Sequence, residues 1–507
     1  MGCANSEAAV YAVGDSPGLA QTYPGAILET APHNSWPTQQ QSCDVTAKEW
    51  DVIVVGGGNA GLVAALAAAD SGAEVLLVER APHHMRGGNT RHTRNIRCAS
   101  GADVSTGDAY RRDELWADLC SVGDGPNDEA LASLTVRESE SMPGWMTAHG
   151  VRWQPALKGT LHLSRTNRFF LGGGKALINT YYREVAHRPA ITVLYDTAAT
   201  DLEIEDRTCA AVVLRTAGES RRVRARAVVC ASGGFESNIA WLRQYWGAAA
   251  DNYAVRGTPY NDGALLSCLY RVGAGRAGQE KGFHAIAVDS RSPRFDGGIA
   301  TRLDSIPFGI VVNKAGERFY DEGEEIWPKR YAMWGRHIAE QPDQAAFSLW
   351  DSRAQGLFLP PMYPPYSADS IEGLAGQLGL DPGVLATTVR RYNDAVQRGG
   401  VFDPRVLDTC RTAGLTPPKS HWARRLDSAP YYAAPMRPGI TFTYMGVAVD
   451  AEARVKRTDG SVFSNVYAAG EIMSGNILSN GYLAGFGLTI GSVWGRRAGT
   501  RAAQNVR

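Results

Sequence analysis

Three apolar runs along the chain are short, rich in β-branched or small residues and followed by glycine within two positions. They are residues 51–55 (DVIVV), 227–231 (AVVCA) and 465–469 (NVYAA). Such runs are typical of strands that are buried on both faces of a parallel sheet. A fourth run, residues 74–78 (EVLLV), follows an Ala/Leu-rich stretch that predicts a helix ending near Ser71. The order strand, helix, strand predicts an α/β domain.

The turn between the first strand and the first helix has the sequence GGGNAG, residues 56–61. It follows a strand, opens a helix and is followed by an acidic residue, Glu79, at the end of the next strand, which is the context of a dinucleotide site. Gly56 permits the tight turn, Gly58 lets the backbone approach the pyrophosphate, and Gly61 lets helix and strand pack closely. Glu79 is expected to bind the ribose hydroxyls, and the helix N-terminus the phosphates.

Three later segments favour FAD over NAD as the dinucleotide. Residues 86–90 (RGGNT) follow the second strand, where backbone amides can reach a flavin; residues 227–235 end a strand in a Gly pair; and residues 465–471 end one in Gly-Glu. A late return strand with an acidic residue fits a long cofactor that crosses a split domain, whereas an NAD-dependent enzyme would have no role for it. The predicted cofactor contacts are Gly56, Gly58, Asn59, Ala60, Gly61, Glu79, Arg80, Gly87, Gly88, Asn89, Thr90, Ala199, Ser232, Gly233, Gly470, Glu471, Gly487 and Leu488.

Composition and charge narrow the class of protein. Hydrophobic residues make up 44% and charged residues 21%, as in globular proteins, and the net charge is zero, so no overall field attracts nucleic acid or an anionic membrane. The eight cysteines form no C-x-x-C pair, which argues against a zinc or iron–sulfur site, so no metal ligand set is predicted and a cytoplasmic location is expected. Neither residues 52–69 nor 472–495 have the composition of a membrane span. Residues 1–46 show no periodicity and are expected to be a disordered extension.

Four segments together make the chain resemble the flavoprotein subunits of the fumarate reductase and succinate dehydrogenase superfamily, over about residues 48–507. Within it the chain looks most like the FAD-dependent tricarballylate dehydrogenases. The segments are residues 86–98 (RGGNTRHTRNIRC), 165–176 (RTNRFFLGGGKA), 317–322 (ERFYDE) and 481–487 (GYLAGFG). The resemblance implies a Rossmann-like FAD-binding domain, residues 47–283 and 443–507, interrupted by an α+β capping domain, residues 284–442.

The family reaction moves a hydride between flavin N5 and a carbon next to a carboxylate or carbonyl, while a side chain handles the proton on the adjacent carbon. Respiratory members attach FAD to a His whose position falls here at Asn89, so non-covalent FAD is expected. The Arg that shuttles the proton in fumarate reductases has its nearest match in Arg330, with Tyr331 and Arg336 as competitors. In the reductases, acidic and basic residues relay the proton to this Arg, and they have no clear counterpart here around residues 302–305.

Other matched positions depart from fumarate reductase. Its substrate-binding His falls at Thr443 and its substrate-binding Arg at Tyr482, which instead resembles the Tyr that polarises the carbonyl in ketosteroid dehydrogenases. His284 lies near another substrate-side His of the reductases. Residues 485–490 are expected to open the last helix at the flavin N1–C2=O edge, where the helix dipole stabilises the reduced flavin.

A series of basic residues follows the flavin loop and is expected to bind substrate carboxylates, because each Arg can hold one carboxylate with two hydrogen bonds. A strand would place Arg91 and Arg97 on one face and Arg94 on the other, whereas a helix would gather Arg94 and Arg97. The predicted substrate contacts, beside Thr443 and Tyr482, are Arg91, His92, Arg94, Arg165 and Arg168.

Three functions remain open. The leading one is an FAD-dependent dehydrogenase or reductase that acts on a CH–CH or C=C bond of a di- or tricarboxylate such as tricarballylate. The second is a desaturase of the ketosteroid dehydrogenase type, and the third is an FAD-binding redox subunit of a larger complex. The chain has no iron–sulfur cysteine set, haem-attachment motif or second dinucleotide fingerprint, so a separate electron-transfer partner is expected.

Overall fold

The computed structural model describes residues 44–102, 108–123, 125–155, 163–295 and 301–506. The elements given below belong to one unit, Val45–Arg507. The predicted extension, residues 1–46, lies outside the described residues up to residue 43. Among the helices of the described ranges, none combines the length and the apolar character that crossing a membrane requires.

The central sheet is parallel, in the order β5, β2, β1, β8 and β18, with β17 added antiparallel at one edge. Helices cover it, so β1, β2 and the second half of β8 are buried and largely apolar. The strand–helix–strand order predicted from the first apolar runs is therefore confirmed. The strands are β1 (Trp50–Val55), β2 (Val75–Val78), β5 (Ile191–Leu194), β8 (Glu219–Cys230), β17 (Arg454–Lys456) and β18 (Val462–Ala468).

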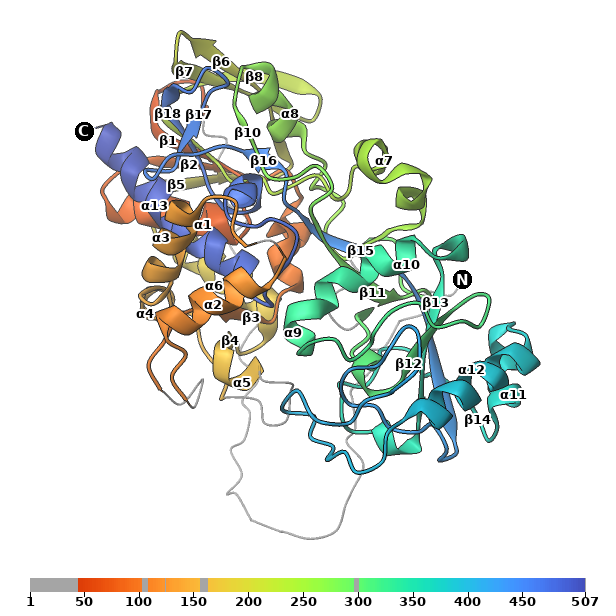
Figure 1. Ribbon diagram of the computed structural model, residues 1–507. Helices are drawn as coiled ribbons and strands as arrows, with labels where there is room; N and C mark the ends of the chain where they lie inside the picture. The colour runs from red at the N-terminus through yellow and green to blue at the C-terminus, as the bar shows by residue number, and fades with distance from the viewer. Residues whose placement is uncertain (1–43, 103–107, 124, 156–162, 296–300, 507) are drawn as a thin grey trace, which may run out of the picture. The chain divides into compact units, whose positions relative to one another are not determined.

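Helices α1 (Asn59–Asp70) and α13 (Phe486–Asn505) lie side by side on this sheet (Figure 1). Glycines of α13 face the backbone of α1. A Cβ added at Gly495 would lie 2.5 Å from Ala60 O, and one added at Gly499 would lie 2.1 Å from Ala64 O. Near the start of both helices a hydrogen bond also joins them, because Asn59 Nδ2 of α1 donates to Ser492 Oγ of α13 at 3.0 Å.

Further elements lie around the parallel sheet. An antiparallel meander of β6, β7 and the first half of β8 extends it, while the second half of β8 pairs with β1. The remaining elements are α2 (Arg112–Ser121), β3 (Asn95–Arg97), β4 (Asn167–Phe169), α3 (Glu129–Ser139), α4 (Met142–Ala148), α5 (Leu163–Thr166), α6 (Gly173–Ala186), β6 (Thr197–Glu205), β7 (Thr208–Thr216), α7 (Ile239–Trp246), α8 (Ala264–Arg271), β10 (Arg276–Ala277) and β16 (Gly446–Val447).

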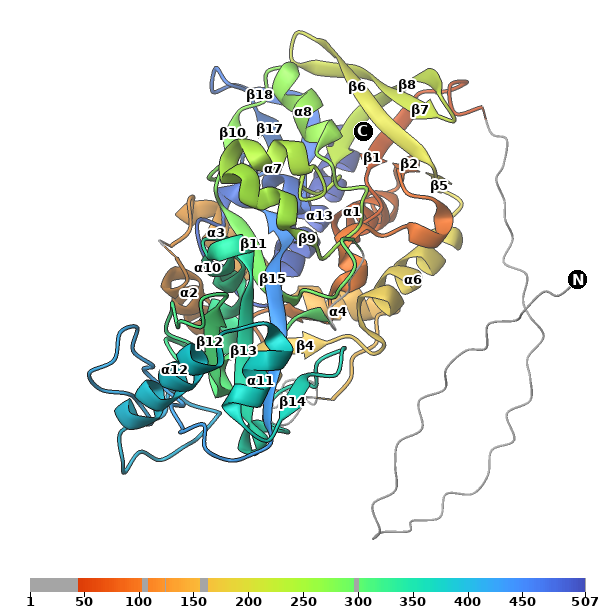
Figure 2. The same cartoon turned by 90° about the vertical axis from the view of Figure 1, so that its right-hand side faces the viewer.

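A second, largely antiparallel sheet, called here the cap sheet, has the order β11, β15, β13 and β12, with β14 and β9 also paired to β15. Strand β15 is the long strand of the cap sheet, and it runs toward the parallel sheet (Figures 1 and 2). The elements are β9 (Ala254–Val255), β11 (Phe283–Asp289), β12 (Ile310–Asn313), α9 (Trp327–Arg330), α10 (Trp334–Ala339), β13 (Ala346–Asp351), β14 (Tyr366–Ala368), α11 (Ile371–Leu378), α12 (Pro382–Ala395) and β15 (Tyr431–Thr443).

The cap sheet buries both faces. Ile310 and Val312 join a cluster with Leu374 and Leu385 of α11 and α12, whereas Val311 joins the main core. Alternate residues of a strand point to opposite faces, so this alternation separates the two layers. The segment predicted as the cap, residues 284–442, contains β12 to β14, α9 to α12 and most of β11 and β15, and β9 joins its sheet from outside that segment.

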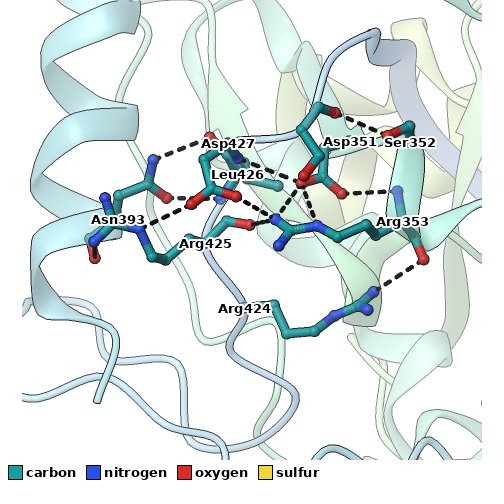
Figure 3. A network of polar contacts seen from close by, with 9 residues as sticks. Asp351, Ser352, Arg353, Asn393, Arg424, Arg425, Leu426 and Asp427 are labelled. Atoms are coloured by element: carbon teal, nitrogen blue, oxygen red, sulfur yellow. Dashed lines mark hydrogen bonds and ion pairs between the residues drawn. The ribbon is translucent and has the colours of Figure 1, made fainter. Parts of the chain in front are cut away.

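A polar network fastens the chain before β15 to the end of β13 and to α12 (Figure 3). Asp351 accepts hydrogen bonds from Arg353 Nε at 3.1 Å and Nη2 at 2.5 Å, and from the backbone of Asp427 at 3.3 Å. Arg353 also pairs with the Asp427 carboxylate at 2.7 Å, and Asn393 bonds both backbone groups of Leu426. The Asp351 side chain is 4% exposed and that of Asp427 is 42% exposed, so the two carboxylates differ in solvent screening.

Replacing Asp351 with alanine is expected to lower the free energy of unfolding by about 2 kcal/mol, because its buried charge-assisted hydrogen bonds are lost. The same change at the exposed Asp427 should cost less than about 1 kcal/mol. Urea unfolding of the two variants measures this difference. Equal losses would show that burial does not set the strength of the network.

Candidate active site

The first turn of the dinucleotide motif forms one end of a cavity. Gly56 has φ +111°, and a Cβ there would lie 2.3 Å from Ala231 O; at Gly61 a Cβ would lie 1.7 Å from Gly56 O. At Gly58, in contrast, the nearest protein atoms would be 3.7 Å away. Gly56 and Gly61 are therefore required by the packing of the protein itself, while Gly58 borders open space, as a position facing a pyrophosphate does.

Glu79 lies at the same end of the cavity, at the tip of β2. Its carboxylate accepts the backbone N–H of Ala81 at 2.8 Å and of Gly87 at 3.3 Å. Burial raises the pKa of Glu79, and these backbone hydrogen bonds act against that rise. The fixed carboxylate at the cavity wall suits ribose hydroxyls. Arg80 also lines the cavity and forms an ion pair with Asp262.

The cavity continues from this turn toward the cap sheet. It measures about 1550 Å³ when the open space at its mouth is included. All predicted cofactor contacts line it except two. Gly61 packs against Gly56, and Gly87, with φ of +105°, lies in the segment of residues 86–90 predicted to reach the flavin, called here the flavin loop. The residues present therefore fit a long dinucleotide that extends from Glu79 to the cap sheet.

Three aromatic side chains form the far end of the cavity. His284 of β11 stacks on Tyr482 with ring centroids 4.1 Å apart, and it meets Tyr331 edge-on at 5.1 Å. Both ring nitrogens of His284 are buried without a partner among the described residues. Burial, reinforced by Arg256 and Arg302, holds the pKa of His284 well below its usual range, so the imidazole is neutral.

The two tyrosines differ in what their hydroxyl groups do. Tyr482 accepts the Gly487 N–H at 3.1 Å, which leaves its O–H free to donate into the cavity. No described residue hydrogen-bonds to the Tyr331 hydroxyl. Burial raises the pKa of Tyr331, while Arg302, Arg256, Arg94 and Arg97 oppose that rise.

Three arginines surround these aromatic residues, and one of them has an acidic partner among the described residues. Arg302 pairs with Asp304 at 2.8 Å and lies over the Tyr331 ring at 4.8 Å; Asp304 also accepts the Trp327 indole N–H at 2.7 Å. Arg256 donates only to Thr441 Oγ1 at 3.1 Å, and its Nη1 has no partner among the described residues. Burial, followed by the charge of Arg302, lowers the pKa of both Arg94 and Arg256 to about 10.

Several predicted site residues lie outside this cavity. Arg330 pairs with Glu324 at 3.3 Å beside a separate small hollow, and Arg336 donates to Lys281 O at 2.9 Å. The Arg165 guanidinium is paired with Glu114. Arg91 donates to His84 O at 3.4 Å, and Arg168, in β4, is not among the residues that line the cavity.

Thr443 lies behind the cavity wall, where its N–H donates to Glu471 at 2.8 Å. Of the predicted substrate contacts, His92, Arg94 and Tyr482 line the cavity, together with Tyr331 and His284 from the catalytic set. Two cavity arginines were not predicted, Arg256 and Arg302. The only local signal was the Arg-x-Asp spacing of residues 302–304, which matched no known relay.

Comparisons with known proteins agree with this geometry. The family model of the FAD binding domain matches residues 51–488. An NADH:fumarate oxidoreductase of Klebsiella pneumoniae (strain 342) is 27% identical in an alignment over 489 residues that covers 92% of this chain. The alignment covers 48% of that protein, so the chain spans about half its length.

Two solved structures share the fold. The open conformation of a flavocytochrome c3 fumarate reductase has a TM-score of 0.71 at 23% identity, covering 91% of this chain and 79% of that one. The 3-ketosteroid-Δ4-(5α)-dehydrogenase of Rhodococcus jostii RHA1, in complex with 4-androstene-3,17-dione, has a TM-score of 0.70 at 22% identity, covering 92% and 99%. The chain thus belongs to the FAD binding domain family.

Proposed function

We propose that the chain oxidises or reduces a carbon–carbon bond next to a carboxylate, in a substrate that carries at least two carboxylates, as tricarballylate does. The observation that supports this most is the pair of buried arginines Arg94 and Arg256, which line the cavity together with His284, Tyr331 and Tyr482. Neither has an acidic partner among the described residues, and the one nearby carboxylate, Asp304, is already paired with Arg302. Buried charges are normally paired, so two guanidinium groups here call for an anionic ligand.

The arginine pKa values support the same conclusion. A guanidinium pKa of about 10 still leaves both groups charged at neutral pH, and its lowering is due to burial and to the like charge of Arg302. A substrate carboxylate can accept two parallel hydrogen bonds from one arginine. Arg94 and Arg256 would then hold two carboxylates beside His284 and Tyr482.

When bound, FAD supplies a two-electron centre that accepts or delivers the hydride. We assign the accompanying proton to Tyr331, rather than to Arg330, because Tyr331 lines the cavity and Arg330 does not. The Tyr331 phenol is neutral at neutral pH, and the guanidinium of Arg302, 4.8 Å from its ring centre, stabilises the phenolate that remains when the proton reaches the substrate carbon. Asp304, paired with Arg302 and Trp327, fixes that guanidinium in place.

Tyr482 and His284 orient the substrate in this proposal. Because Tyr482 already accepts the Gly487 N–H, its own proton is directed to an acceptor in the cavity, such as an oxygen of the carboxylate next to the reacting bond. Neutral His284 can donate one further hydrogen bond without adding charge. Donors placed on that oxygen stabilise the negative charge that develops there.

A ketosteroid dehydrogenase activity is the second candidate, and Tyr482 is the residue that favours it. A neutral ketone, however, would leave Arg94 and Arg256 uncompensated in a closed site. A redox subunit of a larger complex is the third candidate, consistent with a relative about twice as long as this chain. In each case we propose non-covalent FAD and a separate electron-transfer partner. Covalent attachment of FAD would need a nucleophilic side chain at the position of Asn89. The Asn89 amide instead donates to Thr441 O and accepts the Thr258 N–H.

The proposal is tested by titrating the purified flavoprotein with acids while the flavin absorbance reports binding. Tricarballylate and smaller dicarboxylates should perturb the spectrum, a monocarboxylate should bind more weakly, and a neutral 3-ketosteroid should not bind. Tight binding of the steroid and none of the acids would replace the proposal with the second candidate.

Replacing Arg256 with methionine is expected to weaken tricarballylate binding at least about 30-fold, the equivalent of about 2 kcal/mol for one charge-assisted hydrogen bond. Thermal stability should stay the same or rise, because an uncompensated buried charge is removed. The matched control is Arg302→Met, which leaves Asp304 buried and unpaired and should destabilise the fold. Calorimetry and the spectral titration measure both effects. A large loss of stability in Arg256→Met would indicate that Arg256 is structural.

A further inference from the structure

Two buried carboxyl groups, Glu236 and Glu471, meet at the wall of the FAD cavity, which Glu471 lines and Glu236 does not. Glu236 follows β8 and is fully buried, and Glu471 lies in the short 3-10 helix Gly470–Asn476 and is 9% exposed. Both flank the bare Cα of Gly234, where a Cβ would lie 2.3 Å from Glu471 Oε1 and 2.9 Å from Glu236 Oε2. No arginine, lysine or histidine pairs with either group among the described residues.

One carboxylate oxygen of the pair, Glu236 Oε2, lacks a hydrogen-bond donor among the described residues. Glu236 Oε1 accepts from Asn261 Nδ2 at 2.8 Å and from the Asn89 amide, and Glu471 Oε1 accepts the N–H of Thr443 at 2.8 Å and its hydroxyl at 3.2 Å. Glu236 Oε2 has no donor, although it is buried and faces Glu471. Two carboxyl groups can bond to one another only through a proton. Burial raises the pKa of both groups; the charge of Glu236 raises that of Glu471 further, whereas the hydrogen bond with Glu471 acts against the rise at Glu236.

The pair joins three separate parts of the cavity wall. Asn89 belongs to the flavin loop, Asn261 to the loop before α8, and Glu471 to the segment after β18, and all three line the cavity. The other ionisable groups that face the pair are Tyr482, on the chain leading to α13, and Arg256, which reaches it only through Thr441; Asp262, beyond Asn261, is paired with Arg80.

We propose that Glu236 and Glu471 share a single proton that holds the wall of the FAD cavity in place, so that FAD affinity falls when the pair loses this proton. Without it, two adjacent carboxylates repel in a site with no cation, and they would pull Asn89 and Asn261 away from Glu471. Bound FAD adds the negative charges of its pyrophosphate and further excludes water. The pKa of the pair is therefore higher with FAD bound than without it, and affinity is lost as pH rises above the pKa of the apoprotein.

The test measures the dissociation constant of FAD from reconstituted apoprotein between about pH 6.5 and about pH 9. The wild-type constant is expected to rise at least tenfold over this range, about 1.4 kcal/mol. In Glu236→Gln the amide keeps an oxygen for Asn89 and Asn261 and supplies an N–H in place of the proton. Its constant should match wild type within about threefold at the lower pH and should not rise with pH. Glu280→Gln removes an exposed carboxylate and should keep the wild-type profile.

A flat wild-type profile would overturn the proposal, and so would a Glu236→Gln variant that binds FAD less tightly at every pH but keeps the wild-type slope. If that variant does not fold, the infrared spectrum of the wild-type holoprotein decides. The C=O stretch of a protonated, buried carboxyl group should be present near pH 7 and disappear near pH 9, and its absence near pH 7 would overturn the shared proton. None of these readings depends on the substrate.

Discussion

The Gly58→Val variant is expected to purify as a colourless protein, with FAD affinity reduced at least about 100-fold, or about 2.7 kcal/mol. A Cβ at Gly58 meets no protein atom closer than 3.7 Å, so the folded chain tolerates the side chain. The added methyl groups instead occupy the space next to the first turn of α1, where the backbone must approach the pyrophosphate. The flavin-to-protein absorbance ratio after purification measures the effect.

Two matched substitutions separate loss of cofactor from loss of fold. Gly144→Val, in α4, adds the same side chain where nothing lies within 4 Å, and should keep its flavin. Gly61→Val would place its Cβ 1.7 Å from Gly56 O and should fail to fold. A yellow Gly58→Val protein with the wild-type flavin content would refute the placement of the pyrophosphate.

The Tyr331→Phe variant is expected to lose at least about 10²-fold in kcat, the low end for removing a positioned proton-transfer group. FAD content and the KM for the acid should change little, because the ring keeps its packing against His284 and under Arg302. Steady-state kinetics with tricarballylate and an artificial electron acceptor would separate the two parameters.

Arg330→Lys is the discriminating comparison for the proton donor. Arg330 pairs with Glu324 outside the cavity, so this variant should turn over within about threefold of wild type. If kcat collapses in Arg330→Lys and survives in Tyr331→Phe, the proton comes from Arg330 and the cap must move to bring it in.

The cofactor end of the site was predictable because its signals are local in sequence. The turn at residues 56–61, Glu79 at the strand end and the late Gly470-Glu471 step each lie within one strand–turn unit, and their roles follow from backbone geometry. The order of strands around them follows from the apolar runs, which is why the α/β fold was confirmed.

The substrate end was only partly predictable, because it is assembled from distant segments. Arg256 reaches the cavity only because β9 pairs with β15, and Arg302 because residues 301–304 lie against β11. Arg330 and Tyr331 are neighbours in a helical segment, where consecutive side chains point about 100° apart, so an offset of one residue moves a side chain from the cavity to a separate hollow. Arg94 lines the cavity but Arg97 does not. Residues 95–97 form a strand, and the Arg97 side chain pairs with Asp118 at 3.3 Å.

The most direct test of the proposed activity is an anaerobic redox titration of the bound flavin. Oxidised enzyme should be bleached by tricarballylate, or dithionite-reduced enzyme should be reoxidised by the corresponding unsaturated tricarboxylate, in a single turnover and without a partner protein. Arg256→Met and Tyr331→Phe should each slow that step. Bleaching by a 3-ketosteroid with no response to any polycarboxylate would contradict the account, as would a flavin that responds to neither.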